Sequence, residues 1–347
     1  MIVPSNVEMR DVLAAFHAVP DVATRNYYAC PVLPTGLGGL ARSHFKGIAA
    51  FSKKLIFTHT NIDCGATSGK YLIADKLSEG AQGTVDATYD TQAEGWCHPC
   101  AAQACGSFMA MGIQPSEVSG NQSAIQICDL QYTLHNEPMR VLGSIARDEG
   151  INGVGMTKES GPGGRYIVAG VNGKSLTLYR STSDSLQPSE IGFEPIYHTT
   201  EFAESGAGLA LVTQTDGRIF MFTLNANDDG SNNVMCLYTI DILAEAPLSK
   251  LPVDRVMAVP GVSQTLTDLL SYLLNNQTPL GNAIVLLLWA CTEPYLNSSF
   301  RWGKGLAITS PDSVAVYASD RNVFGLSHIS PTRQDFSLVV WGRQEAN

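Results

Sequence analysis

The chain alternates hydrophobic and polar residues in short runs, and Gly, Asp, Asn, Ser or Pro residues separate these runs. This pattern is typical of strands joined by turns in an antiparallel sheet. The first group of runs predicts strands at 47–51, 54–59, 70–76 and 84–89. Two groups with the same order follow, at 101–105, 107–113, 123–129 and 139–145, and at 155–157, 166–171, 176–180 and 193–198. We therefore predict an all-β protein made of four-stranded antiparallel units.

The fourth group begins in the same way, with strands predicted at 209–213, 218–224 and 234–240, and then departs from the pattern. Leucines recur at helical spacing in the segment that follows, which predicts one amphipathic helix over 263–274. The apolar run 284–290 predicts a buried strand that returns the chain to the sheet. The last group predicts strands at 306–309, 314–317, 323–328 and 336–341.

Each group opens with a related six-residue segment, and these segments start at His44, His98, Asn152, Ser205 and Trp302. The starts are 54, 54, 53 and 97 residues apart. Repeats of about 40 to 50 residues with short strands in each unit are typical of propeller blades. We predict a single β-propeller domain over 1–347, with five blades near 44–95, 96–149, 150–200, 201–299 (with the helical insertion) and 300–347. A sixth blade would require 254–299 to be a degenerate blade.

The ends of the chain offer a way to close the ring. An open ring leaves exposed sheet edges, and pairing of the two termini removes them. We therefore expect the segment near Tyr27–Val32 to pair with the last blade.

The five segment starts also define a candidate site, because they should lie at one height around the propeller axis. The positions two residues further on add Lys46, Cys100, Val154, Ala207 and Lys304, and Trp96 and Arg301 flank the set. Small molecules bind where loops converge at one end of a propeller channel. We expect this ring of side chains to bind a ligand, although each of them can instead cap an inner strand by bonding to loop backbone.

Cys97 and Cys100 form a C-x-x-C pair, a motif found in zinc, haem and redox sites. Haem attachment requires His after the second Cys, but Ala101 follows Cys100. A zinc site requires a second ligand pair, which is not evident, and a thioredoxin-type pair begins a helix, whereas this pair precedes a strand. We expect a structural disulfide or buried thiols here, and neither a metal nor another cofactor.

Charge and hydropathy limit the partners. The chain has 32 acidic and 22 basic residues, a net charge of −10 and no basic run, which disfavours binding to nucleic acids or to anionic membranes. No apolar run is long enough to span a bilayer. Met1–Asp21 lacks a signal-peptide pattern, whereas eight cysteines and sequons at Asn121, Asn276 and Asn297 lean towards the secretory route. Localisation and oligomeric state therefore stay open.

A resemblance to known proteins extends over roughly 44–200. It rests on four segments, Trp96–Gln103, Ile125–Leu130, Gly153–Thr157 and Leu176–Ser181. They resemble a group of microbial propeller-like proteins that includes fungal hetero-Diels–Alderases of tropolone-sesquiterpenoid biosynthesis. Those enzymes join a quinone methide to a macrocyclic terpene such as humulene. The resemblance implies a cofactor-independent pericyclase of secondary metabolism that acts on small hydrophobic substrates, and it assigns no catalytic residue.

A cycloaddition requires two partners held in one orientation, which can contribute about 7 to 11 kcal/mol. Under this hypothesis His44, His98 or Lys304 donates a hydrogen bond to the quinone methide oxygen and stabilises its developing charge. Trp96 and Trp302 form an apolar wall, and Lys46, Asn152, Ser205 and Arg301 complete the substrate-binding set.

Two alternatives from other classes remain. The same end of the ring can bind a sugar, a peptide or a protein without catalysis. A hydrolase or lactonase of the calcium-propeller type would require Glu, Asn and Asp around the channel, and only Asn152 of the ring fits that requirement. A glycosidase would require a carboxylate pair, and no two acidic residues occupy equivalent ring positions.

Overall fold

A computed structural model describes residues 8–30, 44–60, 68–91, 95–115, 122–204, 208–228, 230–259, 298–320, 324–325 and 334–343. The helix predicted over 263–274, the strand predicted over 284–290 and Ser205 lie outside these residues. No helix among the described residues is long and apolar enough to cross a membrane.

Four of the blades are antiparallel sheets whose strands follow one another along the chain. The first holds β3 (Phe45–Phe51), β4 (Lys54–His59), β5 (Lys70–Asp75) and β6 (Gln82–Asp90), and the second holds β7 (His98–Cys105), β8 (Phe108–Gln114), β9 (Ser123–Asp129) and β10 (Arg140–Arg147). The third holds β11 (Gly153–Lys158), β12 (Tyr166–Asn172), β13 (Ser175–Ser181) and β14 (Phe193–Thr199), and the fourth holds β15 (Gly208–Gln214), β16 (Ile219–Asn225), β17 (Val234–Ile240) and β18 (Leu248–Val256).

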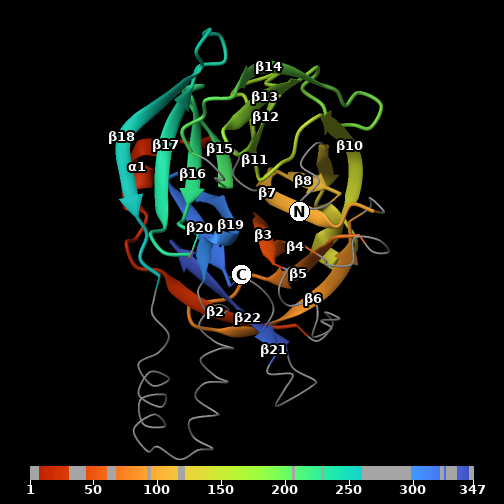
Figure 1. The fold of residues 1–347 in the computed structure, drawn as a ribbon, viewed down its shortest axis with the longest axis vertical. Coiled ribbons are helices and arrows are strands. Elements are labelled where there is room, and N and C mark those ends of the chain that lie inside the picture. The colour runs from red at the N-terminus through yellow and green to blue at the C-terminus, as the bar shows by residue number, and fades with distance from the viewer. Residues whose placement is uncertain are drawn as a thin grey trace, which may run out of the picture.

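The fifth blade is assembled from both ends of the chain. Its strands are β19 (Ser299–Ser310), β20 (Ser313–Ser319), β22 (Gln334–Trp341) and the N-terminal β2 (Thr24–Ala29), with the short β21 (Phe324–Gly325) beside β22. The innermost strands β3, β7, β11, β15 and β19 each contact the next one, and β19 contacts β3 (Figure 1). The described residues therefore form a β-propeller of five blades, which confirms the predicted fold class.

Two blades differ from the sequence-based prediction. The fourth blade is complete, because β18 supplies the outer strand that we did not predict. The side chains of β18 are exposed or half-buried, so this strand has no hydrophobic run that would have predicted it. In the fifth blade we predicted 323–328 as the third strand and 336–341 as the fourth. In the structure β22 pairs directly with β20 and is the third strand, and β2 is the fourth. The described part of 323–328 is the two-residue β21, which lies beside β22.

Strand β2 closes the ring as predicted, and it begins earlier, at Thr24. It pairs antiparallel with β22, with Tyr27 opposite Ser337, and parallel with β6 of the first blade, with Tyr28 opposite Gly83. One N-terminal strand thus joins the last blade to the first. The predicted partners at 31–32 lie outside the described residues.

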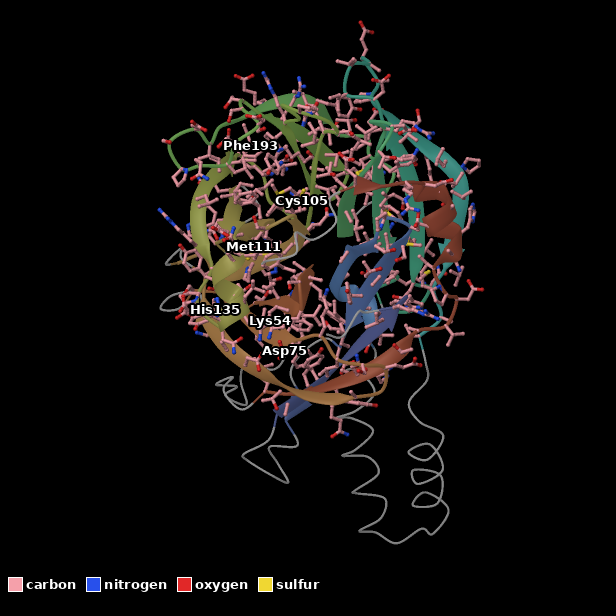
Figure 2. The ribbon with its side chains drawn as sticks, turned by 180° about the vertical axis from the view of Figure 1, so that it is seen from behind. Lys54, Asp75, Cys105, Met111, His135 and Phe193 are labelled. Atoms are coloured by element: carbon pink, nitrogen blue, oxygen red, sulfur yellow. The ribbon has the colours of Figure 1, made fainter. Side chains whose placement is uncertain are left out.

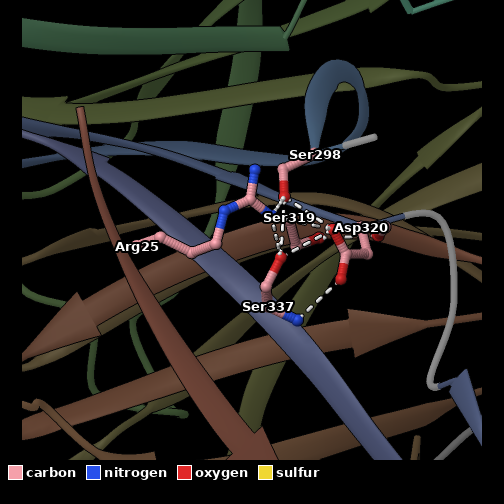
Figure 3. A network of polar contacts seen from close by, with 5 residues as sticks. All are labelled: Arg25, Ser298, Ser319, Asp320 and Ser337. Atoms are coloured by element: carbon pink, nitrogen blue, oxygen red, sulfur yellow. Dashed lines mark hydrogen bonds and ion pairs between the residues drawn. The ribbon is translucent and has the colours of Figure 1, made fainter. Parts of the chain in front are cut away.

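A buried polar network fixes this closure (Figure 3). Asp320, 1% exposed, accepts hydrogen bonds from Ser298 Oγ at 2.6 Å, Ser337 Oγ at 2.7 Å and Ser337 N at 2.7 Å. Arg25 of β2 donates to Ser337 Oγ at 2.6 Å, and its Nη1 lies 3.8 Å from Asp320 Oδ1. Burial raises the pKa of Asp320. The network links β2 to β22 and to the residues next to the ends of β19 and β20.

The rest of the N-terminal segment lies between the fourth and fifth blades. The strand β1 (Glu8–Met9) pairs with β15. The helix α1 (Val12–Ala18), which we did not predict, follows it. Asp11 is the N-cap of this helix, and its side chain accepts a hydrogen bond from Ala14 N at 2.9 Å. Phe16 of α1 packs in one hydrophobic cluster with Phe222 of the fourth blade and Trp341 of the fifth. The helix therefore fills the junction between these blades.

Glycine recurs at the fourth position of the repeated segments because neighbouring inner strands approach one another closely there. A Cβ atom at Gly47 would lie 2.5 Å from Ala102 N, and one at Gly305 would lie 1.8 Å from Ile48 O. Both distances are shorter than any ordinary non-bonded contact. The repeat therefore encodes the contact between blades as well as the strand pattern.

Candidate functional site

Three of the predicted site residues, contributed by three blades, come together at the start of the inner strands. The ring centroid of His44, next to β3, lies 5.5 Å from that of His98 on β7 and 5.8 Å from that of Trp302 on β19. Both contacts are edge-to-face. Arg301 lies over the indole, 4.9 Å from its centroid. We refer to His44, His98, Trp302 and Arg301 as the ring-end cluster.

The proton on the His98 ring can be assigned from its neighbours. The backbone N–H of Ile151 donates to Gln114 Oε1 at 3.0 Å, so the other amide atom, Gln114 Nε2, faces His98 Nδ1 at 3.0 Å. An amide nitrogen can only donate, so Nδ1 must accept. The neutral imidazole therefore carries its proton on Nε2. Cys100 Sγ lies 3.3 Å from the same Nδ1 atom.

His98 keeps this neutral form over a wide pH range. Burial, followed by the charge of Lys46, lowers the pKa of His98 to about 3. Its side chain is fully buried, and Nε2 has no hydrogen-bond partner in the part of the chain that the structure describes. The ring-end cluster thus contains a fixed N–H donor whose direction is set by Gln114.

Positive charge gathers beside this donor. Lys304 on β19 is buried, and burial, Lys46 and Arg301, in that order, lower its pKa to about 7. Its aliphatic stem lies against Gly208, where a Cβ atom would be 2.8 Å from Cδ. Arg301 pairs with Asp228 at 2.5 Å, but that carboxylate is fully exposed. The positive charges of Lys46 and Arg301 therefore act on the Lys304 amine.

Other predicted residues have different places. Asn152 donates to the side chain of Asn172, at the end of β12, at 3.1 Å. Trp96 packs against the hydrophobic cluster that joins the first and second blades. It is therefore not one of the residues of the ring-end cluster. Ser205 lies outside the described residues.

Cys97 and Cys100 are not joined to each other by a disulfide, so of the two expected alternatives Cys100 takes that of a buried thiol. The buried residues Cys30, Cys100, Cys105, Cys128 and Cys236 are thiols and not disulfides, and no disulfide joins two cysteines of the described ranges. In extended backbone, residues three apart are separated by about 10 Å, whereas a disulfide requires Cα atoms about 4.4 to 6.8 Å apart. Nor do three or more His, Cys, Asp or Glu side chains gather as possible metal ligands among the described residues.

Two glutamines were missed by the sequence analysis. Gln114 lies opposite His98 in the β7–β8 hairpin, so the hairpin register could have indicated it. Gln103, from the His98-Pro-x-x-x-Gln103 segment, accepts from Met156 N and Leu211 N, both at 2.7 Å, and donates to Leu211 O at 2.8 Å. It therefore links the inner strands of three blades and has a structural role.

Comparison with known proteins gives no family assignment. No family model matches the chain. No curated protein matches it either. Among solved structures, Sqt1 from Chaetomium thermophilum bound to the N-terminus of the ribosomal protein L10 matches with 15% identity and a TM-score of 0.34, over 56% of this chain and 45% of that one. A second Sqt1 structure from the same organism matches with 12% identity and a TM-score of 0.35. This chain spans just under half the length of the Sqt1 chains.

Two other structures match over more of the chain. A putative glycoside hydrolase from Parabacteroides distasonis has 10% identity and a TM-score of 0.46, covering 87% of both chains. The catalytic domain of the Coprinopsis cinerea GH62 α-L-arabinofuranosidase has 12% identity and a TM-score of 0.41, covering 95% of this chain and 100% of that one. At these identities and TM-scores the matches carry no argument about function.

Proposed function

We propose that the protein binds a small organic molecule at the ring-end cluster, through a ligand oxygen that accepts the Nε2–H of His98. The observation that carries this proposal is the buried Nε2–H itself, which has no acceptor among the described residues. Buried donors are nearly always paired, because an unmade bond costs about 1–3 kcal/mol. A ligand oxygen at this position supplies the missing acceptor.

The charges around the donor favour an acidic ligand. Lys46 and Arg301 raise the local positive potential in a chain whose net charge is −10. A carboxylate or phenolate gains from such a potential more than a neutral oxygen does. The indole of Trp302 offers an apolar contact beside it. An aromatic carboxylate or phenolate therefore fits this cluster best.

Binding of 2-naphthoate and of its neutral counterpart 2-naphthalenemethanol tests this proposal by calorimetry. Two variants isolate the donor. His98→Asn keeps a polar atom near the Nδ1 position and removes Nε2, whereas His98→Gln places an amide near Nε2. We expect the carboxylate to bind more tightly than the alcohol, with a loss of about tenfold in His98→Asn, as for one hydrogen bond of about 1.4 kcal/mol, and a smaller loss in His98→Gln. Equal affinities in both variants and for both ligands would contradict the proposal.

A second candidate is the cofactor-independent hetero-Diels–Alder cycloaddition, and the same donor favours it. A hydrogen bond to the quinone methide oxygen stabilises the negative charge that develops there, and it requires no nucleophile. Incubation with an o-quinone methide generated in situ and humulene tests this reaction. We expect one enantiomer to dominate with the wild-type protein and to be lost with His98→Asn. Product identical to that formed in buffer would exclude this candidate.

The hydrolase alternative has less support. Glycoside hydrolysis uses two carboxyl groups on either side of the bond that breaks. Among the described residues of the ring-end cluster the side chains are His, Trp and Arg, and the neighbouring carboxylate, Asp228, is paired with Arg301 in solvent. The geometry therefore favours recognition of an oxyanion over sugar hydrolysis.

A further inference from the structure

A cavity of about 530 Å³ lies between the second and third blades, on the outer strands β10, β13 and β14 and not on the inner strands that carry His44 and His98. Its size falls within the range of small-molecule pockets. Figure 2 shows Phe193, one of its lining residues, on the outer part of the third blade. The ring-end proposal makes no use of this cavity.

One polar wall of the cavity is fixed by a buried arginine. The Arg147 side chain is 1% exposed; it donates to Tyr179 Oη at 2.8 Å and forms an ion pair with Glu149 Oε1. The hydrogen bonds made by the Glu149 carboxylate all reach Oε1, and the side chain is 29% exposed. Glu149 Oε2 is therefore held in place as an acceptor that faces no protein donor among the described residues.

A second acceptor is oriented by Thr177. Its hydroxyl lies 3.5 Å from Glu149 Oε1 and 3.0 Å from His198 Nδ1. A hydroxyl has one proton and a carboxylate can only accept, so both contacts are satisfied only if Thr177 donates to Glu149 and His198 Nδ1–H donates to Thr177. In the tautomer with its proton on Nδ1, the His198 ring presents Nε2 as an acceptor. His198 is exposed and lines the cavity.

Apolar side chains form the other wall. Phe193 is half-buried and Pro195 is exposed, and both line the cavity. A ligand that fits must therefore combine hydroxyl donors on one side with an apolar face on the other. An anion is disfavoured, because Asp148 and Glu149 both line the cavity and Arg147 already pairs with Glu149.

We propose that this cavity is a binding site for a neutral pyranose sugar, whose C–H face packs on Phe193 and Pro195 while two hydroxyl groups donate to Glu149 Oε2 and His198 Nε2. The site is independent of the ring-end cluster. The site is formed by the second and third blades alone. We therefore expect one sugar to bind per chain at this place.

Saturation-transfer NMR with the methyl glycosides of glucose, galactose, mannose, fucose and arabinose tests the site, followed by titration of the strongest binder. Phe193→Ala and His198→Ala are the test variants. Tyr132→Ala and His135→Ala, exposed side chains on the 3₁₀ helix Gln131–His135, are the matched controls. We expect at least a fivefold loss of affinity in both test variants and none in the controls or in His98→Asn.

NMR of the wild-type protein tests the same site without any substitution. The imidazole signals of His198 should shift on titration with the bound glycoside, and those of His98 should not. Absence of transfer to every glycoside, or binding that Phe193→Ala and His198→Ala leave unchanged, would overturn the proposal. Binding of methylammonium in place of every glycoside would also overturn it, since it would identify a cation site.

Discussion

Gln103 on the second blade bonds to both the N–H and the C=O of Leu211 on the fourth, with distances of 2.7 and 2.8 Å. The same side-chain oxygen accepts from Met156 N of the third blade. One amide thus satisfies three buried backbone groups on the inner strands of its neighbours. Its contribution to the stability of the ring can be measured directly.

Replacement of Gln103 by Leu leaves those three backbone groups without partners. Each unsatisfied buried group costs about 1–3 kcal/mol, so we expect the free energy of unfolding to fall by about 3 kcal/mol or more. Urea denaturation followed by tryptophan fluorescence gives this value. The matched control is Gln131→Leu at an exposed position, which should change stability by less than about 0.5 kcal/mol. A similar loss in both variants would show that Gln103 is not the link described here.

Replacement of Gly305 by Ala tests the close approach of the inner strands. The added Cβ would lie 1.8 Å from Ile48 O, so the fifth blade must move away from the first. We expect a loss of about 3 kcal/mol or more, since backbone cannot yield as a flexible side chain does. The blade-2 equivalent is already Ala101, and Ala101→Gly should cost only about 1 kcal/mol. Thermal unfolding of both variants distinguishes these costs, and a fully stable Gly305→Ala protein would refute the packing argument.

The buried carboxyl group of Asp320 should give the closure of the ring a recognisable pH dependence. Its pKa is raised from 3.8 in the folded protein, so between 3.8 and the folded value the native state binds more protons than the unfolded state. The stability that this group contributes therefore falls as the pH rises through that window. Relative to Asp320→Asn, the wild-type protein should lose stability from about pH 4 upwards. Urea midpoints of both proteins at several pH values measure this difference, which should be absent if Asp320 were solvated.

His98 should show the opposite trend. Its pKa is lowered from 6.5 to about 3, so the unfolded state binds more protons between these values and stability rises with pH across that window. The wild-type protein should gain stability relative to His98→Asn from about pH 3 to about pH 6.5 and stay level above it. Nitrogen-15 NMR gives an independent readout: the His98 ring should keep the Nε2–H pattern down to about pH 4. Protonation of His98 near pH 6 would contradict the described burial.

Some features followed from local pattern alone. The repeat at His44, His98, Asn152 and Trp302 predicted the inner strands, because alternating side chains and turn residues are set by each strand and its immediate neighbours in sequence. The recurring glycine indicated that a side chain is excluded at that position in most blades. The reason, close contact between neighbouring inner strands, is evident only from the tertiary structure. The outer strands were harder: β18 has no hydrophobic run, since outer strands face solvent.

Other features required the tertiary structure. The sequence placed His44, His98 and Trp302 at equivalent positions. Only the fold brings the His44 ring within 6 Å of the other two rings and sets Gln114 against His98 Nδ1. Strand β2 pairs with β22 from the other end of the chain, and the cavity beside Arg147 is lined by residues from two different blades. By itself the sequence determined the repeating strands, because their signals are local. The tertiary structure decided the proton on His98, the role of Gln103 and the second cavity, because long-range contacts fix which side chains meet and how each is solvated.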